Sequence, residues 1–150
     1  MPATGPRTLR AALVAVVLLG AAAAPVRSDT QSEIADVLAA MTGALADADA
    51  GAFLKPIDRK CPAYDTLSNY IPELLRQGTV SSAIEFLKND GDERRRSVQL
   101  DWYLEIHSED AAGPVVRRRV VVDCVFEKQG RSWRIVSLSP VSLFAPQNYE

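Results

Sequence analysis

The spacing of hydrophobic residues changes once along the chain, between a helical period before Gly78 and a period of two after it. Apolar residues that recur every three or four positions share one face of a helix, whereas alternation predicts a strand with one buried face. Three stretches before Gly78 therefore predict helices. Their apolar faces are Ile34, Val37, Leu38, Met41 and Leu45, then Phe53, Leu54 and Ile57, and finally Leu67, Tyr70, Ile71, Leu74 and Leu75.

Residues with capping chemistry mark the predicted helix ends. Thr30 and Glu33 have the spacing of a capping box, in which each side chain accepts a hydrogen bond from a free backbone N–H. Asp65 is placed to cap the third helix, and Gly78 is placed to end it. Pro72 lies inside this helix and removes one backbone donor. The first and third helices are expected to begin at these caps.

From Thr79 onward, alternation predicts an antiparallel meander of four strands with one apolar face. Turn sequences separate the strands at 89–92, 111–114 and 129–130. The inward set predicted by alternation is Val80, Ser82, Ile84, Phe86, Val98, Leu100, Trp102, Leu104, Ile106, Arg118, Val120, Val122, Cys124, Phe126, Trp133, Ile135 and Ser137, with Ser139 as a further candidate.

The register of the strands follows from matching apolar faces and opposite charges across each hairpin. In the middle hairpin this matching sets Trp102 opposite Val120. On the outer face it sets Glu105 opposite Arg117. In the last hairpin it predicts that Phe126 pairs with Trp133.

The first 28 residues are typical of a secretory signal peptide. Arg7 and Arg10 precede an apolar run, Ala11–Ala24, which is 14 residues long. A membrane-spanning helix needs about 20 apolar residues. Cleavage is predicted between positions 23 and 28, after Ala23 or after Ser28, and an uncleaved anchor is the alternative. We expect an exported protein, periplasmic or secreted, in which 29–150 form one domain.

Removing the leader makes the charge more negative. Residues 1–28 contain three arginines and no acids, so the net charge goes from −2 for the chain to −5 for 29–150. Binding of nucleic acid needs a basic surface, so it is not expected. Two cysteines and one histidine cannot supply four Cys or His ligands for zinc. We therefore expect no metal site, and we also expect no cofactor. No second long apolar stretch follows the leader, so no membrane span is expected after it.

The order of helices and strands, and the ending Trp133-Arg-Ile-Val-Ser-Leu-Ser-Pro-Val-Ser-Leu-Phe-Ala-Pro146, resembles the nuclear transport factor 2-like (ketosteroid isomerase-like) superfamily, and in particular exported bacterial members without an assigned function. The resemblance covers about Gln31 to Pro146. It implies an α+β fold in which three N-terminal helices pack on the concave face of a curved four-stranded antiparallel sheet. It also implies that a ligand binds in the cone between helices and sheet.

Catalytic members of this superfamily carry an Asp, alone or with a His or Tyr, inside the cone. The inward set above contains neither an acid nor a histidine, and alternation turns His107 outward. The acids of the sheet are predicted to face outward as well: Glu85, Asp101, Glu105, Asp123 and Glu127. A general base must reach the proton that it removes. Only Asp58 or Asp65, from the helical half, could then serve a cone-site isomerase or hydratase.

Whether the protein is an enzyme stays open, and the sequence favours a domain without catalysis. Such a domain is expected to bind a small apolar or weakly acidic ligand, or a protein partner. The candidate ligand-binding residues are Trp102, Arg118, Tyr70 and Ser137, and Arg118 is expected near the mouth of the cone. A homodimer through the outer sheet face is also predicted, with apolar contacts from Tyr103, Val121, Val125, Val136 and Leu138.

The two cysteines of the chain, Cys61 and Cys124, form a candidate disulfide if the protein is exported. The bond would close a loop of about 60 residues. The alternative is a pair of free thiols, because a buried cysteine also packs as a small hydrophobic residue. The sequence does not choose between the two states.

Overall fold

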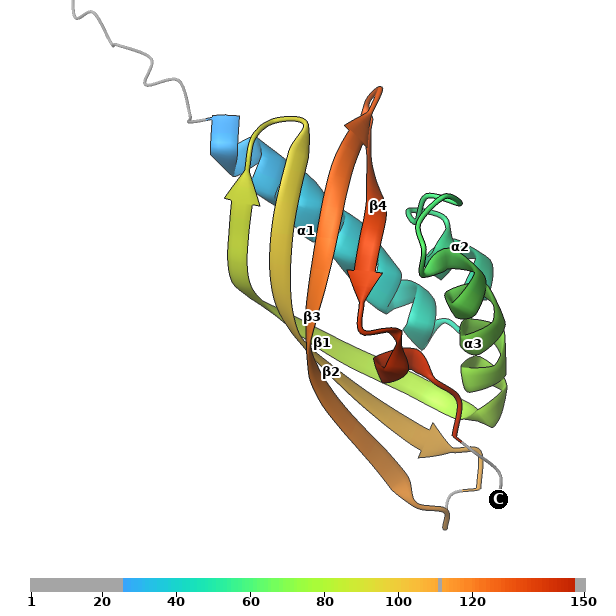
Figure 1. Ribbon diagram of the computed structural model, residues 1–150. Coiled ribbons are helices and arrows are strands. Elements are labelled where there is room, and N and C mark those ends of the chain that lie inside the picture. Colours follow the sequence, from blue (N-terminus) through green and yellow to red (C-terminus); the bar gives the residue numbers. More distant parts are fainter. Residues whose placement is uncertain (1–25, 111, 148–150) are drawn as a thin grey trace, which may run out of the picture.

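The computed structural model describes residues 26–110 and 112–147 (Figure 1). The predicted signal peptide lies outside these residues up to position 25, so it stays a prediction. The helices and strands follow in the order α1 (Val26–Ala46), α2 (Ala50–Leu54), α3 (Tyr64–Gln77), β1 (Gly78–Gly91), β2 (Arg95–Ser108), β3 (Val115–Gln129), β4 (Ser132–Ser139) and a final 3-10 helix, η1 (Val141–Phe144).

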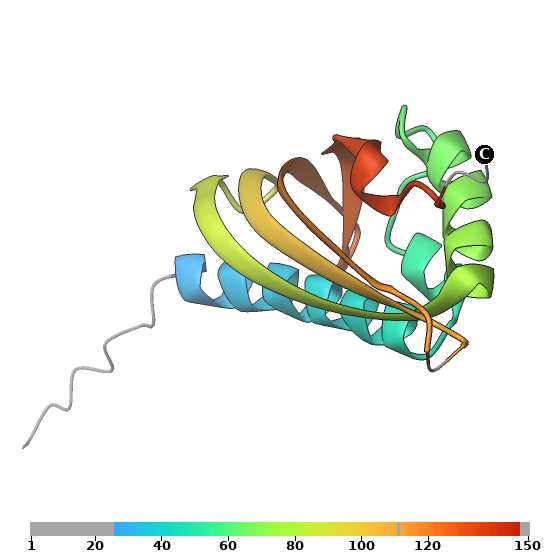
Figure 2. The ribbon, with the colours of Figure 1, turned by 90° about the horizontal axis from the view of Figure 1, so that it is seen from below.

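The predicted α+β architecture is confirmed. The four strands form one antiparallel sheet in the order β1-β2-β3-β4, and the sheet is strongly curved. The long helix α1 runs beneath the concave side of the sheet, and α3 stands across one end (Figure 2). Hydrophobic residues from all three helices and all four strands are buried in one cluster between these layers. No helix in 26–110 or 112–147 is both long and apolar enough to span a membrane.

The predicted register of the middle hairpin is confirmed. Trp102 pairs with Val120, and Glu105 pairs with Arg117. This register places the apolar residues of β2 and β3 on the concave side, where Leu100, Trp102 and Val122 have no exposed surface. Period-two alternation and cross-strand chemistry were therefore sufficient to align the two central strands.

The predicted register of the last hairpin is wrong. Phe126 pairs with Ile135, and Trp133 instead pairs with Lys128. The turn that joins the strands is one cause, because Gln129 pairs directly with Ser132 and leaves a two-residue loop. A register shift between Val125 and Phe126 is the other cause. Neither could be read from the apolar pattern, which fits both pairings.

Because of this irregularity between β3 and β4, two side chains of β4 lie on the faces of the sheet opposite to those predicted. Ser137 pairs with Val125 on the outer face, so it does not face the cone as predicted. Leu138 pairs with Cys124 and is only 4% exposed, so it leaves the outer set that was predicted for a dimer. A β-bulge has this effect because it inserts one residue and reverses the alternation beyond it.

Two helix caps also differ from the prediction. Helix α1 begins at Val26, so Thr30 lies inside the helix and is buried. Helix α3 begins at Tyr64 with Ala63 as its N-cap, which places Asp65 in the first turn. Gly78 ends α3 as predicted. A Cβ atom at this position would lie 2.1 Å from the carbonyl oxygen of His107, so only glycine fits where the chain passes from helix to strand.

Candidate functional site

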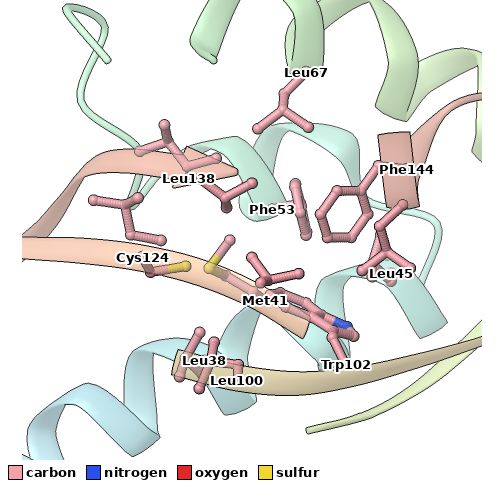
Figure 3. Close-up of a cluster of buried hydrophobic side chains, with 14 of the residues drawn as sticks. Leu38, Met41, Leu45, Phe53, Leu67, Leu100, Trp102, Cys124, Leu138 and Phe144 are labelled. Carbon is pink, nitrogen blue, oxygen red and sulfur yellow. The ribbon is translucent and has the colours of Figure 1, made fainter. Parts of the chain in front are cut away.

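Side chains fill the interior of the cone (Figure 3). Phe144 of η1 inserts between Phe53 of α2 and Trp102 of β2, with ring centroids 5.3 Å from Phe53 and 5.0 Å from Trp102. Both contacts are edge-to-face, the preferred geometry of aromatic pairs, and Phe53, Trp102 and Phe144 have no exposed surface. The cone therefore holds an aromatic cluster formed by the chain itself.

Arg118 fixes the segment that closes the cone. Its side chain points inward as predicted, but the guanidinium Nη1 donates hydrogen bonds to the carbonyl oxygens of Leu143, at 2.9 Å, and Ala145. Burial lowers the pKa of Arg118. Gln77 and Gln147 add a reciprocal pair of hydrogen bonds, 3.0 and 2.7 Å long. The polar donors at the mouth of the cone are thus bonded to the C-terminal segment.

The remaining ligand candidates are not brought together. Trp102 is fully buried in the aromatic cluster, and its indole Nε1 has no hydrogen-bond partner among the described residues. Tyr70 lies half-buried on α3 and does not pack against the core cluster, whereas Tyr64 does. Ser137 faces away from the cone. Of the predicted set, only Trp102 and Arg118 line the interior.

The structure places the candidate catalytic acids outside the cone. Asp58 accepts hydrogen bonds from Gln129, at 2.7 Å, and from the backbone N–H of Lys60, at 2.8 Å. These bonds, that from Gln129 first, hold the pKa of Asp58 below its usual value. Asp65 is exposed on α3. The acids of the sheet face outward as predicted, and Asp101 is bonded there to Arg119.

A surface groove of about 550 Å³ lies outside the cone, between α1, the segment after α2, and the start of β4. Its apolar part comes from Val37, Ala52, Pro56 and Trp133. The segment after α2 is held in place by a short parallel bridge to β4: Ile135 donates to the carbonyl of Pro56, and Asp58 donates to the carbonyl of Ile135, both at 2.9 Å. This volume is within the range of small-molecule sites.

Hydrogen bonds between α1 and the β3–β4 hairpin set the far wall of the groove. The indole Nε1–H of Trp133 donates to Glu33 Oε2 at 2.6 Å, and Lys128 Nζ lies 3.4 Å from the same oxygen. Lys128 Nζ also lies 5.7 Å from the centroid of the Trp133 ring. The ring is therefore held in one orientation with only 4% of its surface exposed.

Cationic side chains surround this apolar floor. Lys55, Arg131 and Arg134 line the groove, and Arg134 donates to the backbone carbonyl of Lys55. Within the described residues, Lys55 and Arg131 form no salt bridge. The acids that line the groove are Asp36 and Glu33, and Glu33 already faces Lys128. The rim is thus locally positive, although the chain carries a net charge of −2.

Replacing Glu33 by glutamine is expected to flatten part of the acid dependence of stability. The hydrogen bond from Trp133, and secondarily Lys128, lowers the pKa of Glu33. A carboxylate whose folded pKa is lowered stabilises the fold above its unfolded pKa, about 4.3, and this contribution is lost as pH falls through the folded pKa. The side chain is 46% exposed, so the effect is below about 1 kcal/mol.

Urea unfolding followed between about pH 6 and pH 3 measures this difference. Asp36→Asn is the matched control, because Asp36 also lines the groove on α1 but forms no salt bridge among the described residues. A Glu33→Gln protein with the same acid dependence as the original chain would contradict the assigned contact.

Both cysteines are free thiols buried in the core cluster. The predicted disulfide is therefore not formed in this structure. Burial, then the charge of Asp123 and that of Cys61, raises the pKa of Cys124 to about 12.

Comparisons with known proteins identify the fold. No protein-family model matches the chain, and no curated protein matches it. Among solved structures, the chain is similar to a function-unknown protein from Mycobacterium tuberculosis, with a TM-score of 0.65, 15% identity and coverage of 78% of this chain and 75% of the other. It is also similar to a nuclear transport factor 2-like protein from Salmonella enterica, with a TM-score of 0.59, 14% identity and coverage of 83% and 96%.

An enzyme is among the structural neighbours. A hexachlorocyclohexane dehydrochlorinase matches with a TM-score of 0.61 and 9% identity, over 75% of this chain and 84% of the other. At such identities the likeness establishes the fold alone, and the chain has the nuclear transport factor 2-like fold. Because this fold carries both enzymes and proteins of unknown function, the function must be argued from the residues of the site.

The groove was missed by the sequence analysis. Lys55 comes from the segment after α2, Arg131 from the turn before β4 and Arg134 from β4 itself, and they meet because the segment after α2 pairs with β4 at Ile135. Trp133 was predicted correctly to face inward, but nothing in the alternation showed that its indole N–H would meet α1. The one available signal was the group Arg131-Ser-Trp-Arg134, in which two cations flank an aromatic residue.

Proposed function

We propose that the protein is an exported, non-catalytic binding domain whose ligand is an apolar molecule with a carboxylate. The ligand lies in the groove between α1 and β4, with its apolar part on Val37, Pro56 and Trp133 and its carboxylate toward Lys55 and Arg131. The single observation that carries this proposal is a pair of cations, Lys55 and Arg131, that have no salt-bridge partner within 26–110 and 112–147 and lie beside an apolar floor.

The arrangement of charges supports an anionic ligand in particular. Long cationic side chains bond carboxylates through charge-assisted hydrogen bonds, which are stronger than neutral ones. A partly apolar groove excludes water from one side of such a bond and supplies hydrophobic contact for the rest of the ligand. A cation would instead meet three positive side chains at the rim, against the two acids Asp36 and Glu33, of which Glu33 already faces Lys128.

The filled cone supports a binding role outside it. A ligand could enter the cone only by displacing Phe144, which is fully buried between two aromatic rings. No acid or histidine faces the interior among the described residues of the sheet, so a base for proton transfer is not supplied there. The basic and apolar start of the chain supports export.

The protein is expected to bind decanoate more tightly than it binds decylamine or decanol. All three probes have the same alkyl chain, so the difference in affinity measures the charge preference of the groove. Lys55→Gln and Arg131→Gln are each expected to weaken decanoate binding about tenfold, which corresponds to about 1.4 kcal/mol. Isothermal titration calorimetry of the purified chain measures these affinities.

Arg117→Gln is the matched control. This substitution also removes one positive charge, but from the outer sheet face, where Arg117 lies 3.8 Å from Glu105 and is 63% exposed. This variant should bind decanoate like the original chain. Equal affinity for decanoate and decylamine, or equal losses in all three variants, would contradict the proposed groove.

The dimer through the outer sheet face also stays a prediction. Val121 is 46% exposed there, as expected for a contact residue. Around it the face carries the ion pair of Arg119 with Asp101, and the imidazole Nε2 of His107 lies 2.7 Å from Glu105 Oε1. Leu138, one of the five residues predicted for this contact, is buried on the other face.

A further inference from the structure

A second hollow, of about 700 Å³, adjoins the ligand groove. Ala52, Lys55 and Arg134 line both spaces, so the two are contiguous along these residues. The Nη1 atom of Arg134 donates to the carbonyl oxygen of Lys55 at 2.5 Å, which holds β4 against the segment after α2 at this boundary. A ligand in the groove therefore has the second hollow directly beyond Lys55 and Arg134.

Polar side chains from three parts of the chain line the second hollow and not the groove. Asp58 and Arg59 follow α2, Tyr64 begins α3, and Gln129 ends β3. Trp133, in contrast, lines the groove and not the second hollow. The groove therefore suits the alkyl part of a ligand, and the second hollow suits part of a polar head group.

The acid that lines the second hollow is already bonded to neutral donors. Both carboxylate oxygens of Asp58 accept hydrogen bonds, Oδ2 from Gln129 at 2.7 Å and Oδ1 from the backbone N–H of Lys60 at 2.8 Å. No salt bridge to Asp58 forms within 26–110 and 112–147. The cations of this hollow are therefore not paired with its acid.

Each of the two spaces has a cation of its own. Arg131 lines the groove, Arg59 lines the second hollow, and Lys55 and Arg134 lie at the boundary. Arg59 and Arg134 form no salt bridge in the part of the chain that the structure describes. One carboxylate between Lys55 and Arg131 would leave the charge of Arg59 without an acidic partner.

We propose that the ligand of the groove carries a second carboxylate, which binds in the second hollow to Arg59 and Arg134. This inference rests on the proposed function, since the alkyl part and the first carboxylate lie in the groove as described there. It narrows the ligand class to amphiphiles with two carboxylates in the head group. A guanidinium binds a carboxylate through two parallel charge-assisted hydrogen bonds, and its bonds to an uncharged amide are weaker.

The test compares N-decanoyl-aspartate with N-decanoyl-asparagine in isothermal titration calorimetry of the purified full chain. The two probes have the same alkyl chain and head groups of the same size, and they differ by one carboxylate. The aspartate probe is expected to bind about tenfold more tightly, because its second carboxylate forms charge-assisted hydrogen bonds. Arg59→Gln should reduce this preference to about threefold or less.

Lys60→Gln is the matched control for Arg59→Gln. Lys60 is the next residue and carries the same charge, but it lines a different hollow, beside Val136. Its backbone N–H, which donates to Asp58, is retained in the variant. The preference for the aspartate probe should therefore stay at about tenfold.

Equal affinity for the two probes would overturn the second carboxylate site and leave the groove in place. The same conclusion would follow if Arg59→Gln kept the full preference, or if Lys60→Gln lost as much of it, since the effect would then come from net charge alone. Failure of the proposed function has a different result: decanoate and N-decanoyl-asparagine, which each carry one carboxylate, would both fail to bind.

Discussion

Replacing Phe144 by alanine is expected to lower the free energy of unfolding by about 3–5 kcal/mol, the usual cost of removing a large aromatic side chain from a core. Phe144 has no exposed surface and contacts both Phe53 and Trp102 edge-to-face. Its removal leaves a cavity between the helices and the sheet that the short η1 segment cannot refill. Equilibrium urea unfolding measures the difference.

Two further variants test this assignment. Phe144→Leu keeps most of the buried volume and should cost much less than the alanine variant. Val121→Ala removes an apolar side chain that is 46% exposed on the outer face, and should change stability by less than about 1 kcal/mol. An alanine variant at 144 that is as stable as the original chain would show that η1 does not close the cone.

Replacing Arg118 by methionine is expected to cost about 2–3 kcal/mol. Methionine keeps the apolar stem but removes the donors to the carbonyls of Leu143 and Ala145, which are then left without their partner. The loss should also loosen η1. Hydrogen exchange at the amide of Ala145, which donates to Ser142 in the original chain, is expected to become faster.

Arg119→Met is the control for this change. Arg119 is the next residue of β3, but it lies on the outer face, where it pairs with Asp101 and is 69% exposed. An exposed ion pair contributes little to stability, so the Arg119→Met protein should unfold much like the original chain, and the amide of Ala145 should be unaffected. Equal effects of the two variants would mean that Arg118 acts only as a surface charge.

The parts of the fold that the sequence predicted are those in which one periodic pattern decides the structure. Alternation fixed the pairing of Trp102 with Val120, because a shift by one residue would expose the whole apolar face. Alternation failed between β3 and β4, because the register shifts between Val125 and Phe126 and the apolar pattern fits the pairing with the shift as well as the pairing without it. Ser137 and Leu138 were therefore assigned to the wrong faces.

The C-terminal segment could not be predicted by periodicity. Leu143 and Phe144 form one apolar pair after the last strand, which is too short to show a period. In the structure this pair closes the cone, and its side chains belong to the buried core cluster. The family resemblance had instead implied that a ligand binds in the cone. Arg118 was placed correctly, but its carbonyl partners on η1 were not foreseen.

The groove depends on tertiary contacts that leave little trace in the sequence. Lys55 and Arg131 belong to separate connecting segments, and the bridge at Ile57 brings them to one rim. The contact between Trp133 and Glu33 joins residues that are 100 positions apart. Such pairs are fixed by packing of α1 under the sheet, which the pattern of each element does not specify.

The two tryptophans of the chain provide the most direct test of where a ligand binds. Trp133 lines the groove, and Trp102 lies inside the cone, so each site has its own indole N–H resonance. In a proton–nitrogen NMR titration with decanoate, the account predicts that the Trp133 resonance shifts with the ligand and that the Trp102 resonance stays in place. A shift of Trp102 with Trp133 unchanged would contradict the groove and place the ligand in the cone.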